Sequence, residues 1–162
     1  MDLFYWLKNY VKHPLQLGAI LPTSSSASRL MVKAISSSEV NLVLELGAGT
    51  GTVTQALIRN GVLEQNLVLV EINREFCNIL ENKYPRAKII CEDVLDFFQD
   101  IDKSLDTKFD AIISGLPLLS IGEAQRELIC DLCITNLSDQ GHFVQITYFL
   151  KCSFPASIVR KY

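Results

Sequence analysis

Short apolar runs alternate along the chain with longer segments in which apolar residues recur every three or four positions. The short runs are apolar at consecutive positions, which is typical of strands buried on both faces, whereas the longer segments have the periodicity of amphipathic helices. The pattern predicts strands over 43–46, 67–70, 87–93, 109–115 and 141–149. It predicts helices over 52–60, 73–84 and 122–137, a short helix or turn over 94–101, and a last helix from Pro155 onward.

The regular alternation of strands and helices predicts an α/β fold, in which a parallel sheet is covered by helices on both sides. Ligands of such sheets bind at the carboxyl ends of the strands, beside the point where the strand order switches. Four candidate ligand-binding residues lie at the predicted strand ends, namely Gly47, Glu71, Asp93 and Ser114. The sequence therefore places a ligand site at this edge of the sheet.

The five cysteines lie in apolar segments, where cysteine commonly acts as a small buried hydrophobe. A single C-x-x-C at Cys130 and Cys133 is weak evidence for zinc, so no metal site is expected. Two of the predicted helices, 73–84 and 122–137, have clear apolar faces. The side chains expected to face inward are Phe76, Ile79, Leu80 and Tyr84 on the first helix, and Leu128, Ile129, Leu132 and Cys133 on the second.

The stretch "LELGAGTG" joins the first strand to a helix and contains Gly47, Gly49 and Gly51. A dinucleotide fingerprint, G-x-G-x-x-G, would require a glycine at position 52, where this chain has Thr52. The spacing G-x-G-x-G thus lacks the glycine that brings helix and strand together around a pyrophosphate. It is suited to a ligand whose nucleoside and amino-acid parts lie close to the backbone.

Acidic residues close the neighbouring strands. A carboxylate at Glu71 can accept hydrogen bonds from both hydroxyls of a ribose, and one at Asp93 can accept from an adenine amino group. Glu45 precedes the glycines and can orient their loop or meet a cationic amine. One such acid alone would be interpreted as a solvated strand end. Together with the glycines, and in register with the predicted strand ends, they indicate a nucleoside site.

This constellation resembles the class I S-adenosylmethionine (SAM)-dependent methyltransferases over residues 40–150. "ELGAGTG" is similar to their first motif, Glu71 to their ribose acid and "EDV" to their adenine-contact motif. The resemblance implies a Rossmann-like sheet of order 3-2-1-4-5-7-6, of which this chain supplies the first five strands and no final hairpin. The cofactor-binding residues that it implies are Glu45, Gly47, Ala48, Gly49, Gly51, Glu71, Ile72, Asp93 and Val94.

The fourth predicted strand ends in "SGLPLLS". Enzymes that methylate adenine amino groups usually carry an amide or acid, a proline and an aromatic residue here, but Ser114 and Leu118 occupy the first and last of these positions. A flipped base would lose a hydrogen bond and a stacking partner. This turn counts against a nucleic-acid substrate.

Together with "GAILPTS", "VEIN" and "FVQITY", the turn resembles the soluble bacterial phospholipid N-methyltransferases, which convert phosphatidylethanolamine stepwise to phosphatidylcholine. The turn contains no His or Lys that could act as a base, so we expect Ser114, Gly115 and Leu116 to present backbone carbonyls or a hydroxyl to the amine. Tyr148 would hold the developing ammonium over its ring or by its hydroxyl, although an interior aromatic is nearly as good an interpretation.

The chain is expected to form one domain, with an interfacial helix over 1–13, a segment covering the cofactor over 14–40 and the Rossmann-like core over 41–162. The first segment is amphipathic: an aromatic-rich apolar face is flanked by lysines, which suits a lipid interface or packing on the chain's own domain. The residues expected at the membrane are Phe4, Trp6, Leu7, Lys8 and Lys12. This segment is not typical of a secretory signal because an acid opens it and charges interrupt it.

The net charge of −3 is unevenly distributed. Residues 1–35 and 142–162 each have a balance of +3, whereas the middle carries eight basic against seventeen acidic residues. An acidic body does not suit wrapping by nucleic acid, but basic ends can meet an anionic surface. We expect a cytoplasmic protein associated with the inner face of the cell membrane. Two alternatives stay open: an enzyme similar to ribosomal RNA adenine N6-methyltransferases, and a truncated, non-catalytic SAM- or lipid-binding module.

Overall fold

The computed structural model describes residues 25–33, 35, 40–101, 108–146 and 154–161. The expected interfacial helix, the segment 14–24 and Tyr148 lie outside these residues. The helices are α2 (Ser25–Lys33), α3 (Thr52–Arg59), η1 (Glu64–Asn66), α4 (Arg74–Lys83), α5 (Val94–Asp100), η2 (Leu118–Ser120), α6 (Glu123–Thr135) and α7 (Ala156–Lys161). The strands are β1 (Val43–Leu46), β2 (Leu67–Val70), β3 (Lys88–Ile90), β4 (Phe109–Ser114) and β5 (Leu137–Gln145).

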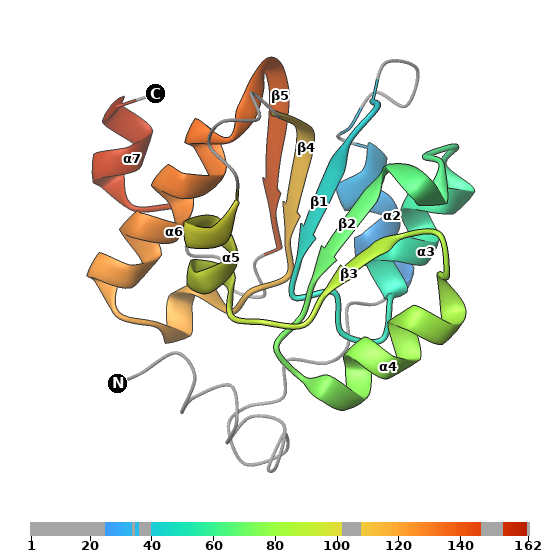
Figure 1. Cartoon of the computed structure of the whole chain (residues 1–162). Helices are drawn as coiled ribbons and strands as arrows, with labels where there is room; N and C mark the ends of the chain where they lie inside the picture. The colour runs from blue at the N-terminus through green and yellow to red at the C-terminus, as the bar shows by residue number, and fades with distance from the viewer. Residues whose placement is uncertain (1–24, 34, 36–39, 102–107, 147–153, 162) are drawn as a thin grey trace.

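The strands form one sheet of order β3-β2-β1-β4-β5, in which every neighbouring pair is parallel. This confirms the α/β fold and the strand order 3-2-1-4-5. Helices α2, α3 and α4 cover one side of the sheet, and α5, α6 and α7 cover the other (Figure 1). The switch in order lies at β1, between β2 and β4, so the ends of these three strands meet at the glycine turn.

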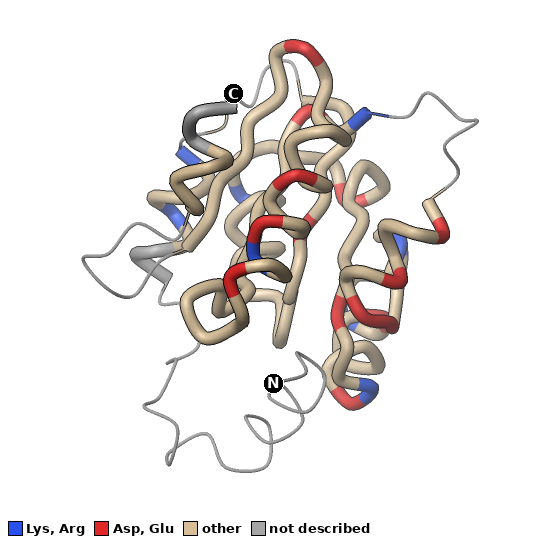
Figure 2. Tube along the Cα trace, turned by 90° about the vertical axis from the view of Figure 1, so that its left-hand side faces the viewer, with Lys and Arg blue, Asp and Glu red and all other residues tan. Residues whose placement is uncertain are grey.

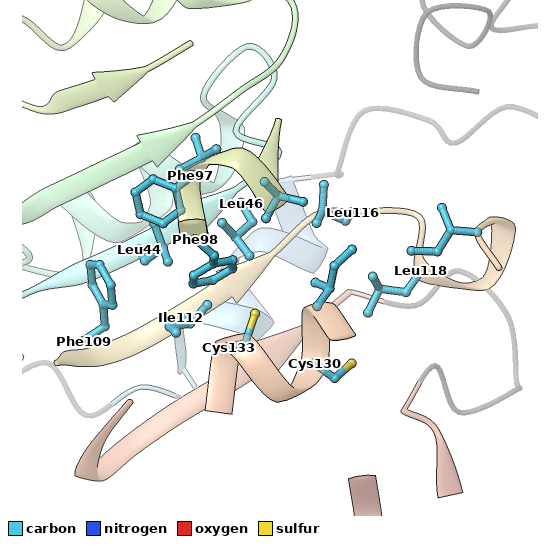
Figure 3. Packing of buried hydrophobic residues seen from close by; sticks show 14 of the residues in the cluster. Leu44, Leu46, Phe97, Phe98, Phe109, Ile112, Leu116, Leu118, Cys130 and Cys133 are labelled. Atoms are coloured by element: carbon cyan, nitrogen blue, oxygen red, sulfur yellow. The ribbon is translucent and has the colours of Figure 1, made fainter. Parts of the chain in front are cut away.

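Two apolar clusters fill the space between the sheet and its helices. Because successive strand residues point to opposite faces, Leu44 and Leu46 of β1 belong to one cluster and Val43 to the other. Figure 3 shows the first cluster from close by. There Phe97 and Phe98 of α5, Cys130 and Cys133 of α6, and Leu44, Leu46, Phe109, Ile112, Leu116 and Leu118 pack together.

Helix α2, the described part of the expected covering segment, packs on α3. Met31 and Val32 of α2 are buried in the second cluster with Leu57 of α3. This part of the segment therefore has a structural role, and the covering of a cofactor by 14–40 stays a prediction.

The inward faces of two helices differ from the sequence-based expectation. Ile79 is 43% exposed and Leu128 48% exposed, so both point to solvent. In α4 the buried stripe runs through Cys77, Leu80 and Tyr84, which share a face at spacings of three and four. Ile79 is turned away from that stripe, and the smaller Cys77 takes the inward position.

Strand boundaries near the site also differ from expectation. β3 ends at Ile90 rather than at Asp93, because the Asp93 carboxylate caps α5 by accepting from the Leu95 N–H at 2.8 Å. β5 begins earlier than predicted, and its pairing with β4 is irregular, since Phe109 pairs with Leu137 and Ala111 with His142. The regular part of β5 ends beside Ser114, at the same edge as the other strand ends.

Candidate functional site

The glycine turn follows β1 directly. Gly47, Gly49 and Gly51 all have positive φ angles, 71°, 56° and 81°, a backbone conformation that side chains disfavour. The N–H of Gly47 donates to the Val70 carbonyl at 2.8 Å, which ties the turn to the end of β2. A Cβ at Gly49 would meet no atom of the described residues within 4 Å. The backbone at Gly49 is thus open to a ligand, as the nucleoside prediction requires.

Glu71, at the end of β2, reaches across to this turn. Its Oε2 accepts from the Gly49 N–H at 2.8 Å, and its Oε1 accepts from the Asn73 N–H at 2.9 Å. The residue is only 8% exposed. Burial raises the pKa of Glu71, while the N–H groups of Asn73 and Gly49 lower it.

Each carboxylate oxygen of Glu71 offers further lone-pair capacity beyond these bonds, so the side chain can still receive ribose hydroxyls. Together, the open backbone at Gly49 and the adjoining carboxylate fit the sugar and the amino-acid part of SAM. Contact with ribose stays a prediction for Glu71, as does cofactor contact for its neighbour Ile72.

Glu45 lies inside the domain rather than in the crevice. It is 2% exposed, and its Oε2 accepts from the Thr54 hydroxyl at 2.7 Å. Burial raises the pKa of Glu45 to about 8, so the buried carboxyl holds a proton at neutral pH. Of the two roles expected for Glu45, the structure supports orientation of the loop, through a link from β1 to α3, and not contact with a cationic amine.

Asp93 and Val94 lie where β3 gives way to α5. The Asp93 side chain caps the helix, and the Val94 side chain is buried in the first cluster. Val94 therefore offers a ligand only its backbone. The expected contact between Asp93 and adenine, and a contact at Ala48, stay predictions.

The turn after β4 packs against the glycine turn. A Cβ at Gly115 would lie 3.1 Å from the Gly47 carbonyl oxygen, and the Gly115 N–H donates to the Leu46 carbonyl at 2.8 Å. A larger residue at position 115 would push the two turns apart. The sequence pattern did not reveal this close approach.

The expected role of the Ser114 hydroxyl is not supported. Ser114 is fully buried, its Oγ accepts from the Leu116 N–H at 3.3 Å, and its carbonyl accepts from the Ile146 N–H at 3.0 Å. The Leu116 carbonyl accepts from both Leu118 N–H and Gln145 Nε2, each at 2.9 Å. No described residue donates to the Gly115 carbonyl. Among the three residues proposed from sequence, Gly115 therefore has the carbonyl available to a substrate.

Two contacts near the site were not indicated by the sequence, although the pattern did place Tyr84 on an inward face. Tyr84, at the end of α4, donates its hydroxyl hydrogen to the Gly51 carbonyl at 2.9 Å. Gln145, at the end of β5, contacts the turn after β4 through its side-chain amide. Each contact joins two elements that are far apart in the chain, so periodicity and spacing could not predict these contacts.

The residues described contain no group of three or more His, Cys, Asp or Glu arranged to hold a metal ion. The surface of α5 and α6 is acidic: these two helices together carry five acidic residues and one basic residue. Acidic positions are spread along the helices seen in Figure 2. Such a surface repels a polyanion.

The chain matches the family model described as a methyltransferase domain over residues 43–141. It is 30% identical over 150 residues to ornithine lipid N-methyltransferase from Singulisphaera acidiphila, a match that covers 90% of this chain and 78% of that protein. Ribosomal RNA small subunit methyltransferase A from Thermotoga petrophila is 28% identical over 129 residues, or 76% of this chain. The match spans 46% of that relative's length.

Among solved structures, the glycopeptide N-methyltransferase MtfA, complexed with S-adenosylmethionine, is similar with a TM-score of 0.59. The identity is 17%, and the match covers 78% of this chain and 55% of that one. At this identity the likeness demonstrates a shared fold and nothing more specific. It agrees with the sheet order seen here.

Proposed function

This chain belongs to the class I SAM-dependent methyltransferases, and we propose that it methylates the headgroup amine of a membrane lipid. The observation that carries the proposal is the similarity to ornithine lipid N-methyltransferase over most of both chains. The substrate that we propose is phosphatidylethanolamine with its methylated derivatives. Ornithine lipid also ends in a primary amine, so the two lipids form separate arms of the test.

The cofactor supplies a methyl group already activated as a sulfonium. A neutral amine nitrogen would form the new N–C bond as the C–S bond breaks, which would leave a neutral thioether and an N-methylammonium that releases its proton to solvent. The protein therefore mainly has to position the amine. The Gly115 carbonyl can accept an N–H of that amine, because no described residue occupies it. The close packing of Gly115 on Gly47 places this carbonyl beside the glycine turn.

The turn after β4 supports an aliphatic amine over a nucleobase. Ser114 has its hydroxyl engaged inside the turn, and Leu118 is buried in the first cluster. Neither side chain is available to hydrogen-bond or stack on a flipped base. A small amine needs no such platform.

Membrane contact is proposed for residues outside the described part of the chain. Phe4, Trp6 and Leu7 would enter the lipid interface, and Lys8 and Lys12 would meet anionic headgroups. Within the described residues, no helix combines the length and apolarity needed to cross a bilayer. Trp6→Ala is expected to weaken vesicle binding while leaving cofactor affinity unchanged.

The direct test is transfer of a radiolabelled methyl group from SAM to vesicles. One set contains phosphatidylethanolamine, a second ornithine lipid, and a third only phosphatidylcholine, whose quaternary nitrogen cannot accept a methyl group. Label is expected in the first set, and label in the second alone would identify ornithine lipid as the substrate. Background counts in both amine sets, with an intact chain, would contradict the lipid proposal.

A ribosomal RNA adenine methyltransferase is the second candidate, favoured by the similarity to the Thermotoga petrophila enzyme. Strongly salt-dependent binding of RNA, followed by label in adenine, would support it. A non-catalytic module is distinguished by calorimetry, since it would bind the cofactor without turnover on any amine.

A further inference from the structure

Gln145 lies at the end of β5, directly beside Ser114 in the sheet. Its Nε2 donates to the Leu116 carbonyl at 2.9 Å and to the Ile146 carbonyl at 2.6 Å. Both amide hydrogens are therefore used. A flipped amide would place Oε1 against two carbonyl oxygens, so the hydrogen bonds themselves determine which end of the amide carries the oxygen.

The other end of this amide has no donor within the described part of the chain. Gln145 Oε1 is buried, yet no hydrogen bond reaches it. A buried acceptor left unpaired loses its hydrogen bonds to water without replacement, and native proteins retain few such groups. A donor carried by a ligand would satisfy this oxygen.

The surrounding turn explains which donor is needed. In adenine-methylating enzymes the amide or acid at the end of the fourth strand is expected to face the acceptor amine, but Ser114 replaces it here and is buried. Gln145 brings an amide to the same turn from the neighbouring strand. Gln145 Oε1 receives no hydrogen bond from a described residue, and the neighbouring Gly115 carbonyl is likewise without a donor among the described residues.

We propose that Gln145 Oε1 accepts a hydrogen bond from the amine that receives the methyl group, and so shares its positioning with the Gly115 carbonyl. The assignment rests on the proposed amine substrate. A neutral primary amine has two N–H groups, which match these two acceptors. When both are bound, the nitrogen lone pair is left to point toward the methyl group.

Stepwise methylation provides the test, since each added methyl group removes one N–H. The neutral primary amine has two N–H groups, the monomethyl amine one and the dimethyl amine none. Gln145→Met removes the acceptor with little change in side-chain volume. We expect kcat/KM for the primary amine to fall about 10-fold, the value for the monomethyl amine to fall less, and that for the dimethyl amine to stay unchanged.

The graded response separates positioning of the amine from support of the fold. Loss of the bond from Nε2 to the Leu116 carbonyl would disturb the turn equally for all three lipids, so an equal reduction across the series would overturn the assignment. Gln140→Met is the matched control, because Gln140 is exposed on the same strand. It is expected to leave all three rates unchanged.

Cofactor binding and wild-type turnover are measured alongside. Gln145→Met is expected to bind the demethylated cofactor product as tightly as the unaltered chain does. A loss of cofactor affinity as large as the loss in kcat/KM for the primary amine would contradict a role at the amine. If the unaltered chain methylates none of the three lipid amines, the proposed function fails and this assignment with it. If it methylates them and Gln145→Met does so equally well, the assignment alone fails.

Discussion

Tyr84 contacts the glycine turn at Gly51, which lies 33 residues earlier in the chain. The hydroxyl donates to the Gly51 carbonyl at 2.9 Å, and a Cβ at Gly51 would lie 2.6 Å from Tyr84 Cε2. The neighbouring Lys83 Nζ donates to the Thr50 carbonyl at 3.3 Å. The end of α4 thus holds the point where the turn passes into α3.

Gly51→Ala is expected to destabilise the protein through two effects. The positive φ of 81° disfavours alanine by about 1–2 kcal/mol, and the added Cβ collides with the Tyr84 ring. Gly61→Ala is the matched control, because its φ is 97° but a Cβ there would meet no atom within 4 Å in the part of the chain that the structure describes. Urea denaturation should show a clearly larger loss for Gly51→Ala. Equal losses would mean that the ring moves aside without cost.

Glu71→Ala should weaken cofactor binding strongly. The change removes the carboxylate expected to hold the ribose and releases the Gly49 N–H, and loss of a charge-assisted hydrogen bond of about 1.5–3 kcal/mol corresponds to about 10- to 100-fold in affinity. Calorimetry with the demethylated cofactor product measures it. Glu75→Ala removes an equal charge at an exposed position nearby and should have no effect. Unchanged affinity in Glu71→Ala would remove this residue from the cofactor site.

Glu45 should make stability depend on pH. Burial raises its pKa from 4.5 to about 8 in the folded protein, so between these values the folded state binds a proton that the unfolded state releases. The stabilising contribution is complete below about pH 4.5 and is lost, at about 1.4 kcal/mol per pH unit, as the pH rises toward 8.

Glu45→Gln removes this titration while keeping an oxygen that can accept from the Thr54 hydroxyl. Urea unfolding at about pH 5.5, 7 and 8.5 should show a flatter pH dependence for the variant than for the unaltered protein. Parallel curves for the two proteins would indicate that Glu45 is already ionised in the folded state.

Asp110 should affect stability without affecting the site. One carboxylate oxygen accepts from the N–H groups of Asn41 and Leu42, at 2.8 and 3.0 Å, and the other accepts from the Ser138 hydroxyl at 3.2 Å. These bonds join the beginnings of β1 and β5, at the end of the sheet away from the glycine turn. Asp110→Ala is expected to cost about 1–3 kcal/mol in the free energy of unfolding and to leave cofactor affinity unchanged. Asp139→Ala, at an exposed position, is the control.

Local pattern was sufficient for the order of elements and for the ligand edge of the sheet. The runs at Val43–Leu46 and Leu67–Val70 are apolar at each position except Glu45, and this pattern reports burial on both faces, hence parallel strands between helices. Because the carboxyl ends of parallel strands meet at one edge, the sequence alone was sufficient to predict that the glycines and Glu71 lie together.

The prediction of inward-facing side chains was wrong where it rested on hydrophobicity alone. Ile79 and Leu128 were expected inside, but the rotation of each helix is determined by the whole stripe that meets the sheet, including the smaller Cys77 and Cys130. Glu45 is a comparable case. Its position before the glycines was evident, whereas its link to Thr54 depends on how α3 packs on β1.

From the sequence alone came the alternation of strands and helices, the glycine spacing and the acids at strand ends, because each of these follows from backbone geometry over a few consecutive residues. The tertiary structure alone decided which polar atoms are already bound and which stay available. Gln145 meets Ser114 and Leu116 only after β4 and β5 pair. Hydrogen bonds between such distant segments depend on register and packing, which no local pattern contains.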